Sequence, residues 1–177
     1  MTNFTLAHAT GTEWKSISEK CLAMLGKIDS PSGFEPLGML YITDNLAEDA
    51  ENILTLLRTQ TGVDDWVGSV GMGICATGQE YFDQPAMAIL IGEFLADSFR
   101  LLSTLKSPGM LPVSLADWAQ SRESRFGIVH ADPRNGDILE IIAELSNLLD
   151  SFLVGGLTSS RSELSQFSGN VTSAGVS

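Results

Sequence analysis

Three groups of residues in this sequence have side chains and spacings that could support chemistry. The segment Gly71-Met-Gly-Ile-Cys-Ala76 matches G-x-G-x-x-A, the pattern with which a strand and the following helix bind a dinucleotide pyrophosphate. Just before it, Ser69 lies among glycines, as a catalytic serine does at a strand-to-helix turn. His8 and His130 are the only imidazoles that could hold a metal or a haem.

The residues around the first two patterns argue against catalysis. A dinucleotide site needs a helix that begins at the glycines, whereas Thr77, Gly78 and Pro85 predict a turn and another strand. Ser69 lacks the G-x-S-x-G spacing because position 67 is Val67, and no spaced Ser, His and Asp arrangement is present. We therefore expect no enzyme, with a hydrolase on the Ser69 side kept as an alternative.

The histidines and cysteines predict structural roles. His8 and His130 each lie near the end of an expected strand, outside any spaced cluster of metal ligands, so we expect hydrogen-bonded structural histidines. One histidine is enough to ligate a haem, so haem bound by His8 or His130 stays an alternative, and otherwise we expect no cofactor. Cys21 and Cys75 lie far apart in apolar surroundings, which predicts reduced, buried thiols.

Composition narrows the class of protein. Hydrophobic residues make up 44% of the 177 residues and charged residues 18%, which is typical of a folded domain. A formal charge of -12 opposes binding to nucleic acid, which needs clustered Lys and Arg. The first residues lack a basic and an apolar signal region, and no apolar run approaches the roughly 18 residues of a membrane span. We therefore expect a soluble, cytoplasmic protein.

Hydrophobic periodicity predicts alternating helices and strands. The predicted helices cover 13–28, 46–59 and 137–149, with a short helix that begins at 114. The predicted strands cover 37–42, 66–70, 85–91, 126–130 and 152–157, after a first strand that ends near His8. The run at 37–42 is apolar without alternation, as in strands buried on both faces.

The order of these elements repeats along the chain. Asp44 follows a strand and precedes a helix in the first half, as Asp132 does in the second. We predict an α/β (α+β) fold: one layered domain over 1–177 with two similar βαββ repeats, about 1–95 and about 112–177, and helices packed on mixed sheets. The repeat places residues 171–177 in a strand, so we expect the chain to be a fragment cut within that strand.

A cleft between the repeats would be lined by glycines and small hydroxyl groups. The glycines that recur in both halves serve either close strand packing or a ligand that contacts exposed backbone amides. For the second case, the predicted ligand-binding residues are Gly68, Ser69, Gly71, Gly155, Gly156, Thr158, Ser159 and Arg161. In this set the hydroxyl groups supply neutral hydrogen bonds, and Arg161 would hold a carboxylate.

Several short segments together resemble the FIST N-terminal domain, a bacterial and archaeal sensory module. They are Ala-His8-Ala-Thr-Gly, Leu-Gly-Met-Leu-Tyr-Ile-Thr-Asp44, Trp66-Val-Gly-Ser-Val-Gly71, Phe152-Leu-Val-Gly-Gly156-Leu, and Gln166-Phe167 with Gly169. The likeness rests on the order and spacing of strands that contain glycine. It covers most of the chain and carries no catalytic signature.

The resemblance implies a function that the residues alone do not. It implies an intracellular signal-transduction module that binds a small ligand such as an amino acid and that does not catalyse a reaction. Such domains usually continue into a FIST C-terminal domain and act with histidine-kinase, diguanylate-cyclase or chemoreceptor partners. Some relatives are haem-containing nitric-oxide sensors, which keeps the haem or metal sensor as the alternative.

Overall fold

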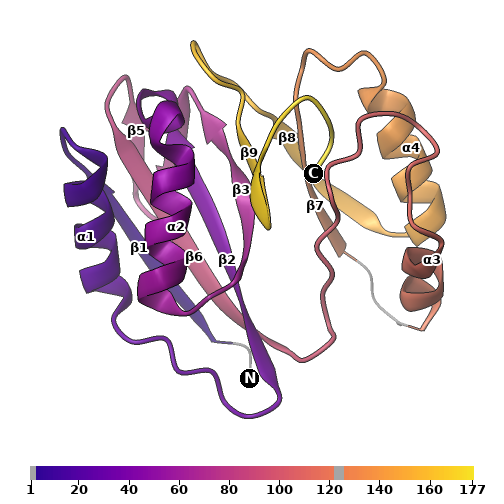
Figure 1. Ribbon diagram of the computed structural model, residues 1–177, viewed down its shortest axis with the longest axis horizontal. Helices are drawn as coiled ribbons and strands as arrows, with labels where there is room; N and C mark the ends of the chain where they lie inside the picture. Colours follow the sequence, from indigo (N-terminus) through magenta and orange to yellow (C-terminus); the bar gives the residue numbers. More distant parts are fainter. Residues whose placement is uncertain (1–2, 122–125) are drawn as a thin grey trace.

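The computed structural model describes residues 3–121 and 126–177. Within them the chain forms one six-stranded sheet, two two-stranded sheets and four α-helices (Figure 1). None of these helices is long and apolar enough to cross a membrane. The elements are β1 (Phe4–Thr10), α1 (Trp14–Leu25), β2 (Phe34–Thr43), the 3₁₀ helix η1 (Asp44–Asp49), α2 (Ala50–Thr61), β3 (Asp65–Gly71), β4 (Gly73–Ala76), β5 (Gln79–Phe82), β6 (Ala86–Leu95), α3 (Val113–Gln120), β7 (Phe126–Ala131), α4 (Ile138–Leu149), β8 (Phe152–Leu157), β9 (Gln166–Ser168) and β10 (Asn170–Thr172).

The large sheet has the strand order β1-β6-β2-β3-β9-β10. β2 and β3 are parallel, and α2 crosses between them, because the chain must return to the same end of the sheet before a parallel partner can begin. β6 runs antiparallel to both β1 and β2. The apolar run predicted as a central strand is β2, and it has paired strands on both sides.

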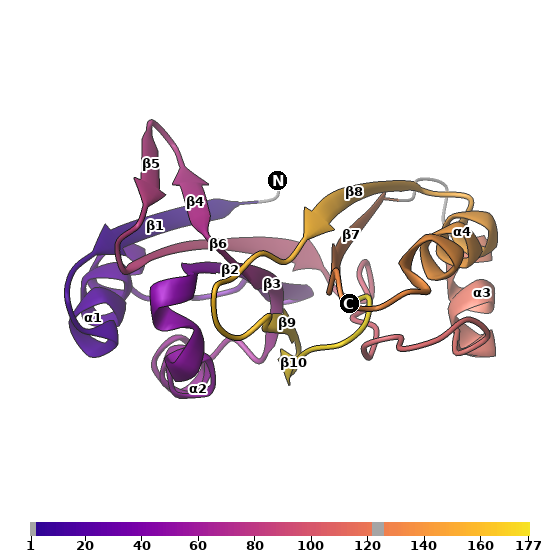
Figure 2. The same ribbon diagram turned by 90° about the horizontal axis from the view of Figure 1, so that it is seen from above.

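The main core lies on one face of this sheet. α1 and α2 cover that face, while the β4–β5 hairpin stands on the opposite side (Figure 2). Strand alternation sends every second side chain toward the helices, where Leu40 and Ile42 of β2 are fully buried. Trp66 of β3 and Phe167 of β9 are the largest fully buried side chains in this core.

A second unit, β7–α4–β8, forms its own small sheet beside the first. Its two strands are parallel and joined by α4, as β2 and β3 are joined by α2. Ile141 and Leu145 of α4 pack on Ala131 of β7 in a separate, smaller core. We call β7–α4–β8 the second unit and the large sheet with α1 and α2 the first unit.

The chain after β8 connects the two units. β9 leaves the second unit and pairs antiparallel with β3 at the edge of the large sheet, and β10 turns back on β9. The chain then returns to the second unit, where Val176 bridges Ala131. The backbone N–H groups of His130 and Ser177 each donate to the carbonyl oxygen of the other, at 2.8 and 2.9 Å.

The predicted mixed α/β class is confirmed, but two complete repeats are not shown. The first unit has paired strands before and after its parallel pair, whereas the second unit is β–α–β only. The strand predicted over residues 171–177 is replaced by the short β10 and the isolated bridge at Val176. The Gly-rich connection before β6, predicted as a turn, contains the β4–β5 hairpin.

Candidate functional site

A row of residues runs across the large sheet on the face away from α1 and α2. Strand register places His8 of β1 opposite Ala88 of β6, Ala88 opposite Tyr41 of β2, Tyr41 opposite Ser69 of β3, and Ser69 opposite Gln166 of β9. Directly opposed residues point to the same side of a sheet. The row therefore presents hydroxyl, imidazole and amide groups where the sheet face that carries the β4–β5 hairpin meets the second unit.

His130, near the end of β7, meets this row at Tyr41. Its Nε2 lies 3.1 Å from the Tyr41 hydroxyl oxygen, and the two rings meet edge to face with centroids 5.6 Å apart. Only 5% of His130 is exposed. Burial lowers the pKa of His130 from 6.5 to about 4 and raises the pKa of Tyr41. Both groups are therefore uncharged at neutral pH.

A second hydrogen bond joins the two units beside the first. Oγ of Ser69 in β3 lies 2.9 Å from Oγ1 of Thr158, which directly follows β8. Thr158 is held in place because its backbone N–H donates to the carbonyl oxygen of Ala131 at 2.8 Å. Oγ of Ser159 accepts a hydrogen bond from the backbone N–H of Met72 at 3.1 Å. Neutral groups thus tie the end of β3 to the segment after β8.

Between these contacts lies a hollow of about 380 Å³, which we call the inter-unit hollow. Its volume falls within the range of small-molecule sites, about 300–1,000 Å³. Side chains and backbone of both units form its walls, and the described residues that line it include no Lys, Arg, Asp or Glu. The lining residues are Tyr41, Ser69, Val70, Gly71, Gly73, Ile74, Cys75, His130, Gly155, Gly156, Leu157 and Ser159.

The structure brings most of the predicted ligand-binding residues together. The ones that line the inter-unit hollow are Ser69, Gly71, Gly155, Gly156 and Ser159. Thr158 lies behind the lining and contacts it through Ser69. Gly68 and Arg161 lie outside the lining.

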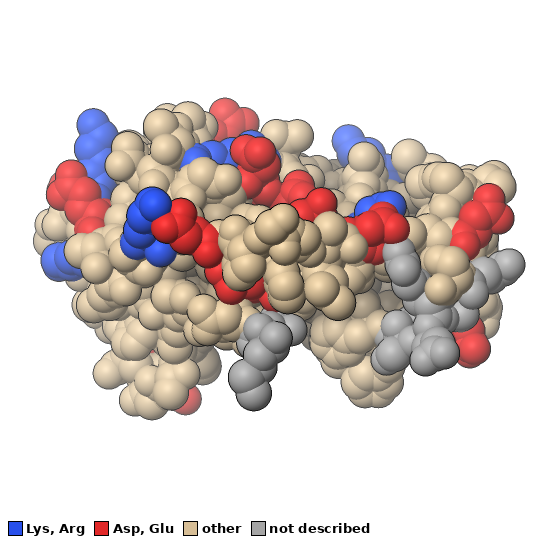
Figure 3. Space-filling view, turned by 90° about the horizontal axis from the view of Figure 1, so that it is seen from below, with Lys and Arg blue, Asp and Glu red and all other residues tan. Residues whose placement is uncertain are grey.

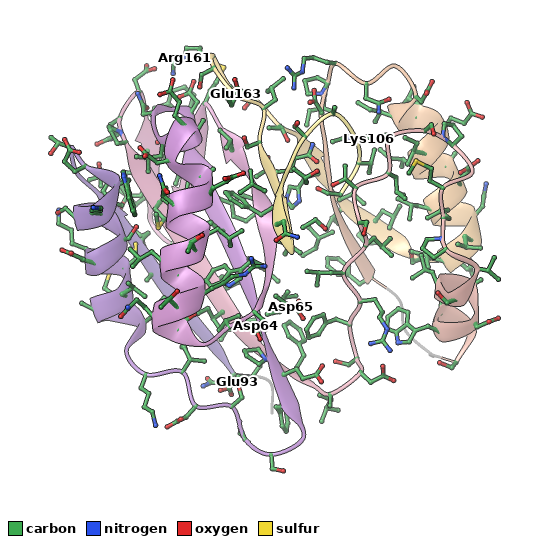
Figure 4. All side chains as sticks on the ribbon, in the orientation of Figure 1. Asp64, Asp65, Glu93, Lys106, Arg161 and Glu163 are labelled. Carbon is green, nitrogen blue, oxygen red and sulfur yellow. The ribbon has the colours of Figure 1, made fainter. Side chains whose placement is uncertain are left out.

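Arg161 forms ion pairs with two carboxylates. Its Nε and backbone nitrogen donate to Oδ2 of Asp44 at 3.0 and 2.9 Å, and a terminal nitrogen donates to Oδ1 of Asp83 at 2.6 Å. The Asp83 hydrogen bond and the charge of Asp44 raise the pKa of Arg161. Figure 4 places Arg161 and Glu163 at one end of the molecule, far from Asp64, Asp65 and Glu93 at the other. The carboxylate-binding role expected of Arg161 would require it to leave these partners.

The glycines divide into two kinds. Gly68 and Gly155 have φ of +146° and +151°, and a Cβ on either would collide with the carbonyl oxygen of the neighbouring parallel strand. Close strand packing therefore explains both. Gly156 is different, because a Cβ there would meet no heavy atom within 4 Å. Register places Gly156 opposite His130, so its open side faces the inter-unit hollow.

Some lining residues carry no clear signal in the sequence. Sequence reasoning predicts His130 as a hydrogen-bonded structural histidine, with haem ligation as the alternative, and does not select Tyr41. A histidine in a buried strand without a charged neighbour was the available signal for His130. Gly73, Ile74 and Cys75 enter the site through the β4–β5 hairpin. Cys75 is exposed, so the prediction that both cysteines are buried is correct for Cys21 only.

The geometry gives little support to haem or metal. Nε2 of His130 is hydrogen-bonded to the Tyr41 hydroxyl, and Nδ1 of His8 in β1 lies 2.5 Å from the Tyr81 hydroxyl. A haem ligated by Nε2 of His130 would have to displace Tyr41. In the part of the chain that the structure describes, no three His, Cys, Asp or Glu residues converge on a metal position. The residues present therefore do not form a fitted haem or metal site.

The two sequence patterns weighed for catalysis have structural explanations. Gly71 ends β3 and Gly73 begins β4 after a bend at Met72, so no helix begins at the glycines, as expected. The hydroxyl of Ser69 donates to the carbonyl oxygen of Val70 at 3.0 Å and contacts Thr158. Within the described residues no imidazole is hydrogen-bonded to Ser69, so nothing there would activate it as a nucleophile.

A larger hollow of about 580 Å³ lies between α3 and α4, and its only lining residues with polar side chains among those described are Glu144 and Asn147 of α4. Leu111, Pro112 and Val113 form much of its wall, and Glu144 already accepts a hydrogen bond from the backbone of Gly109. On the face shown in Figure 3, basic residues lie singly among acidic and uncharged ones. The described residues on that face form no basic patch of the kind that nucleic acid requires.

The chain matches the sequence model of one protein family, the FIST N domain, over residues 36–177. The matched part contains every residue that lines the inter-unit hollow. β1 and α1 precede it, although β1 completes the large sheet by pairing with β6. No curated protein and no solved structure matches the chain.

Proposed function

Since this chain belongs to the FIST N domain family, whose members are sensory domains of signalling proteins, we propose that the inter-unit hollow binds the small ligand that the domain senses. One observation carries the proposal. Two hydrogen bonds between uncharged side chains, Tyr41–His130 and Ser69–Thr158, join the two units at the wall of a hollow large enough for a small molecule. A ligand there contacts both units at once.

Signalling follows if the ligand prefers one arrangement of the two units. A ligand shifts a conformational equilibrium only by the difference in its affinity for the two states. At this site the difference arises because the ligand competes for, or bridges, the groups of Tyr41, His130, Ser69 and Ser159. The shifted arrangement then acts on a FIST C-terminal domain or on an associated output of the histidine-kinase, diguanylate-cyclase or chemoreceptor type.

The domain that we propose for this role covers 1–177 and derives from an internal duplication. The parallel β–α–β units β2–α2–β3 and β7–α4–β8 support this origin, as does the matching backbone of Gly68 and Gly155. Amino acids are the first ligand class to test. A zwitterion, however, would need partners for both charges, and none of the described residues that line the hollow has a charged side chain.

A thermal-shift screen of amino acids and neutral metabolites tests the proposal. A ligand that binds the native state and not the unfolded state raises the melting temperature, and the increase grows with the logarithm of its concentration above Kd. We expect at least one compound to stabilise the wild type but not Gly156→Val, in which the new side chain occupies the hollow. Gly136→Val is the control, because Gly136 lies in an exposed turn with similar open space. A compound that stabilises wild type and Gly156→Val equally would refute this site.

A further inference from the structure

His130 retains hydrogen-bonding capacity that the protein does not use. Its Nε2 is shared with the Tyr41 hydroxyl, while Nδ1 has no hydrogen-bond partner among residues 3–121 and 126–177. The imidazole lines the inter-unit hollow although only 5% of the residue is exposed. A neutral imidazole offers Nδ1 as a donor in one tautomer and as an acceptor in the other. Because Tyr41 can accept or donate, it supports both tautomers.

β8, the strand next to His130 in the small sheet, offers backbone groups to the hollow. β8 pairs with β7 along one edge, and no described strand pairs with its other edge. A strand edge presents N–H donors and C=O acceptors in alternation. Gly155, Gly156 and Leu157 bring this stretch of β8 into the hollow. The absence of a side chain at Gly156 lets a ligand approach the backbone closely.

As far as residues 3–121 and 126–177 form its walls, the hollow is lined by uncharged residues. A buried ion without a counter-charge loses far more hydration energy than neutral hydrogen bonds return. The positive charge that sequence reasoning assigned to this site, Arg161, is paired with Asp44 and Asp83. The formal charge of -12 on the whole chain further opposes the approach of anions.

We propose that the inter-unit hollow selects an uncharged ligand with an adjacent donor and acceptor, as in a carboxamide, which pairs with Nδ1 of His130 and the free edge of β8. The inference rests on the proposed function and narrows the ligand class of that same site. It excludes free carboxylates, amines and zwitterionic amino acids as the preferred ligands. It assigns His130 the discriminating role, because this imidazole recognises the ligand without contributing a charge.

Three nearly isosteric probes separate charge from shape. Benzamide is neutral, benzoate is an anion and benzamidine is a cation, and all three have the same ring. The chain has only two histidines, so protein labelled with ¹⁵N-histidine gives two imidazole spin systems. His8→Asn assigns them. We expect benzamide to shift the His130 resonances saturably and to leave His8 unchanged, with an affinity at least tenfold above that of the two ions.

Two variants test whether the change in the His130 resonances comes from benzamide bound in the inter-unit hollow. Gly156→Val should weaken the benzamide response at His130 at least tenfold, because valine suits a strand and fills the space next to the imidazole. Gly136→Val should leave the response unchanged. Circular dichroism and the His8 resonances confirm folding of each variant. Equal benzamide affinity in Gly156→Val and wild type would overturn the assignment to this hollow.

The outcomes separate the ligand class from the proposed function. If benzoate or benzamidine shifts His130 as strongly as benzamide, the hollow is a ligand site but the neutral class is wrong. If benzamide leaves His130 unshifted throughout the titration, the carboxamide inference fails. In that case the proposed function is still tested separately, by the thermal-shift screen that compares wild type with Gly156→Val.

Discussion

Gly68 and Gly155 hold the same backbone position in two different sheets. A Cβ on Gly68 would lie 1.8 Å from the carbonyl oxygen of Leu40, and a Cβ on Gly155 would lie 1.7 Å from that of Val129. In both cases the glycine is on the second strand of a parallel pair, and the carbonyl is on the first. Only glycine permits this approach, so these positions fix how closely β3 packs on β2 and β8 packs on β7.

The first prediction compares neighbouring glycines in β8. Gly155→Ala should destabilise the protein by about 3 kcal/mol or more, because its Cβ displaces a backbone carbonyl and its φ disfavours a side chain. Gly156→Ala should change the free energy of unfolding by less than about 0.5 kcal/mol. Chemical denaturation of both variants checks this. Similar losses of unfolding free energy in the two variants would contradict the close approach of β8 to β7.

The second prediction concerns the hydrogen bond between the units. Ser69→Ala and Thr158→Val should each lower the free energy of unfolding, and the double variant should lose less than their sum. A coupling of about 1 kcal/mol is expected for a buried pair of neutral groups at 2.9 Å. A double-mutant cycle by urea denaturation measures it. Ser160→Ala, in the exposed segment after β8, is the control, and strict additivity of Ser69→Ala and Thr158→Val would contradict the bond.

The third prediction uses pH. Hydrogen bonds from Arg134, and one from the backbone N–H of Ala174, lower the pKa of Asp132 from 3.8 to about 2. The folded-state pKa lies below the unfolded-state value, so Asp132 contributes stability above pH 3.8, and that contribution disappears as pH falls toward 2.

Asp132→Asn should therefore lower the free energy of unfolding by about 1–3 kcal/mol at pH 7 and by less as the solution is acidified below 3.8. Denaturation of wild type and variant across this range checks the trend. Asp117→Asn, on the exposed side of α3, is the control for loss of a carboxylate. A stability difference that is independent of pH would contradict the assignment.

The fourth prediction separates the two ion pairs of Arg161. The Asp44 side chain is 4% exposed, whereas the Asp83 side chain is 69% exposed. Arg161→Gln leaves a buried carboxylate without its charged partner and should lower the melting temperature more than Asp83→Asn, which removes only an exposed ion pair. Thermal denaturation at low and high salt compares them. Equal costs would show that burial of Asp44 is not the deciding factor.

The fifth prediction concerns the two thiols. Burial raises the pKa of Cys21 to about 12, whereas Cys75 is exposed on the wall of the inter-unit hollow. A thiol reagent should therefore modify one cysteine per native chain, and Cys75→Ser should abolish that fast reaction. Any ligand of the hollow should slow it. Rapid modification of Cys21 in native Cys75→Ser would contradict the core packing of α1.

The sequence predicts what depends on local periodicity. The apolar run of β2 and the amphipathic patterns of α2 and α4 identify these elements, with differences of a few residues at their ends. Most of the predicted ligand-binding residues converge, because glycine-bearing strands in both halves lead to the boundary between the units. That convergence shows where a ligand could bind, and the ligand itself stays a prediction.

Long-range pairing explains what the sequence did not predict. β9 and β10 have three residues each, too few for a periodic pattern, and β9 pairs with a strand nearly a hundred positions earlier in the chain. The partners of Arg161 come from η1 and from the turn after β5, which no local spacing connects. Tyr41 likewise gains its role only because His130 approaches it from the second sheet.

The position of β9 has a consequence for how the molecule comes apart. β9 is a strand of the large sheet, yet β8 before it belongs to the small sheet, and beyond β10 the chain returns to that sheet, where Val176 bridges Ala131. The Ser177 hydroxyl also donates a hydrogen bond to the amide oxygen of Gln166. Neither sheet can melt without removing a strand or a backbone partner from the other. We expect amide hydrogen exchange in β3 and β7 to report a single cooperative opening, so that a disturbance in one sheet changes protection factors in both.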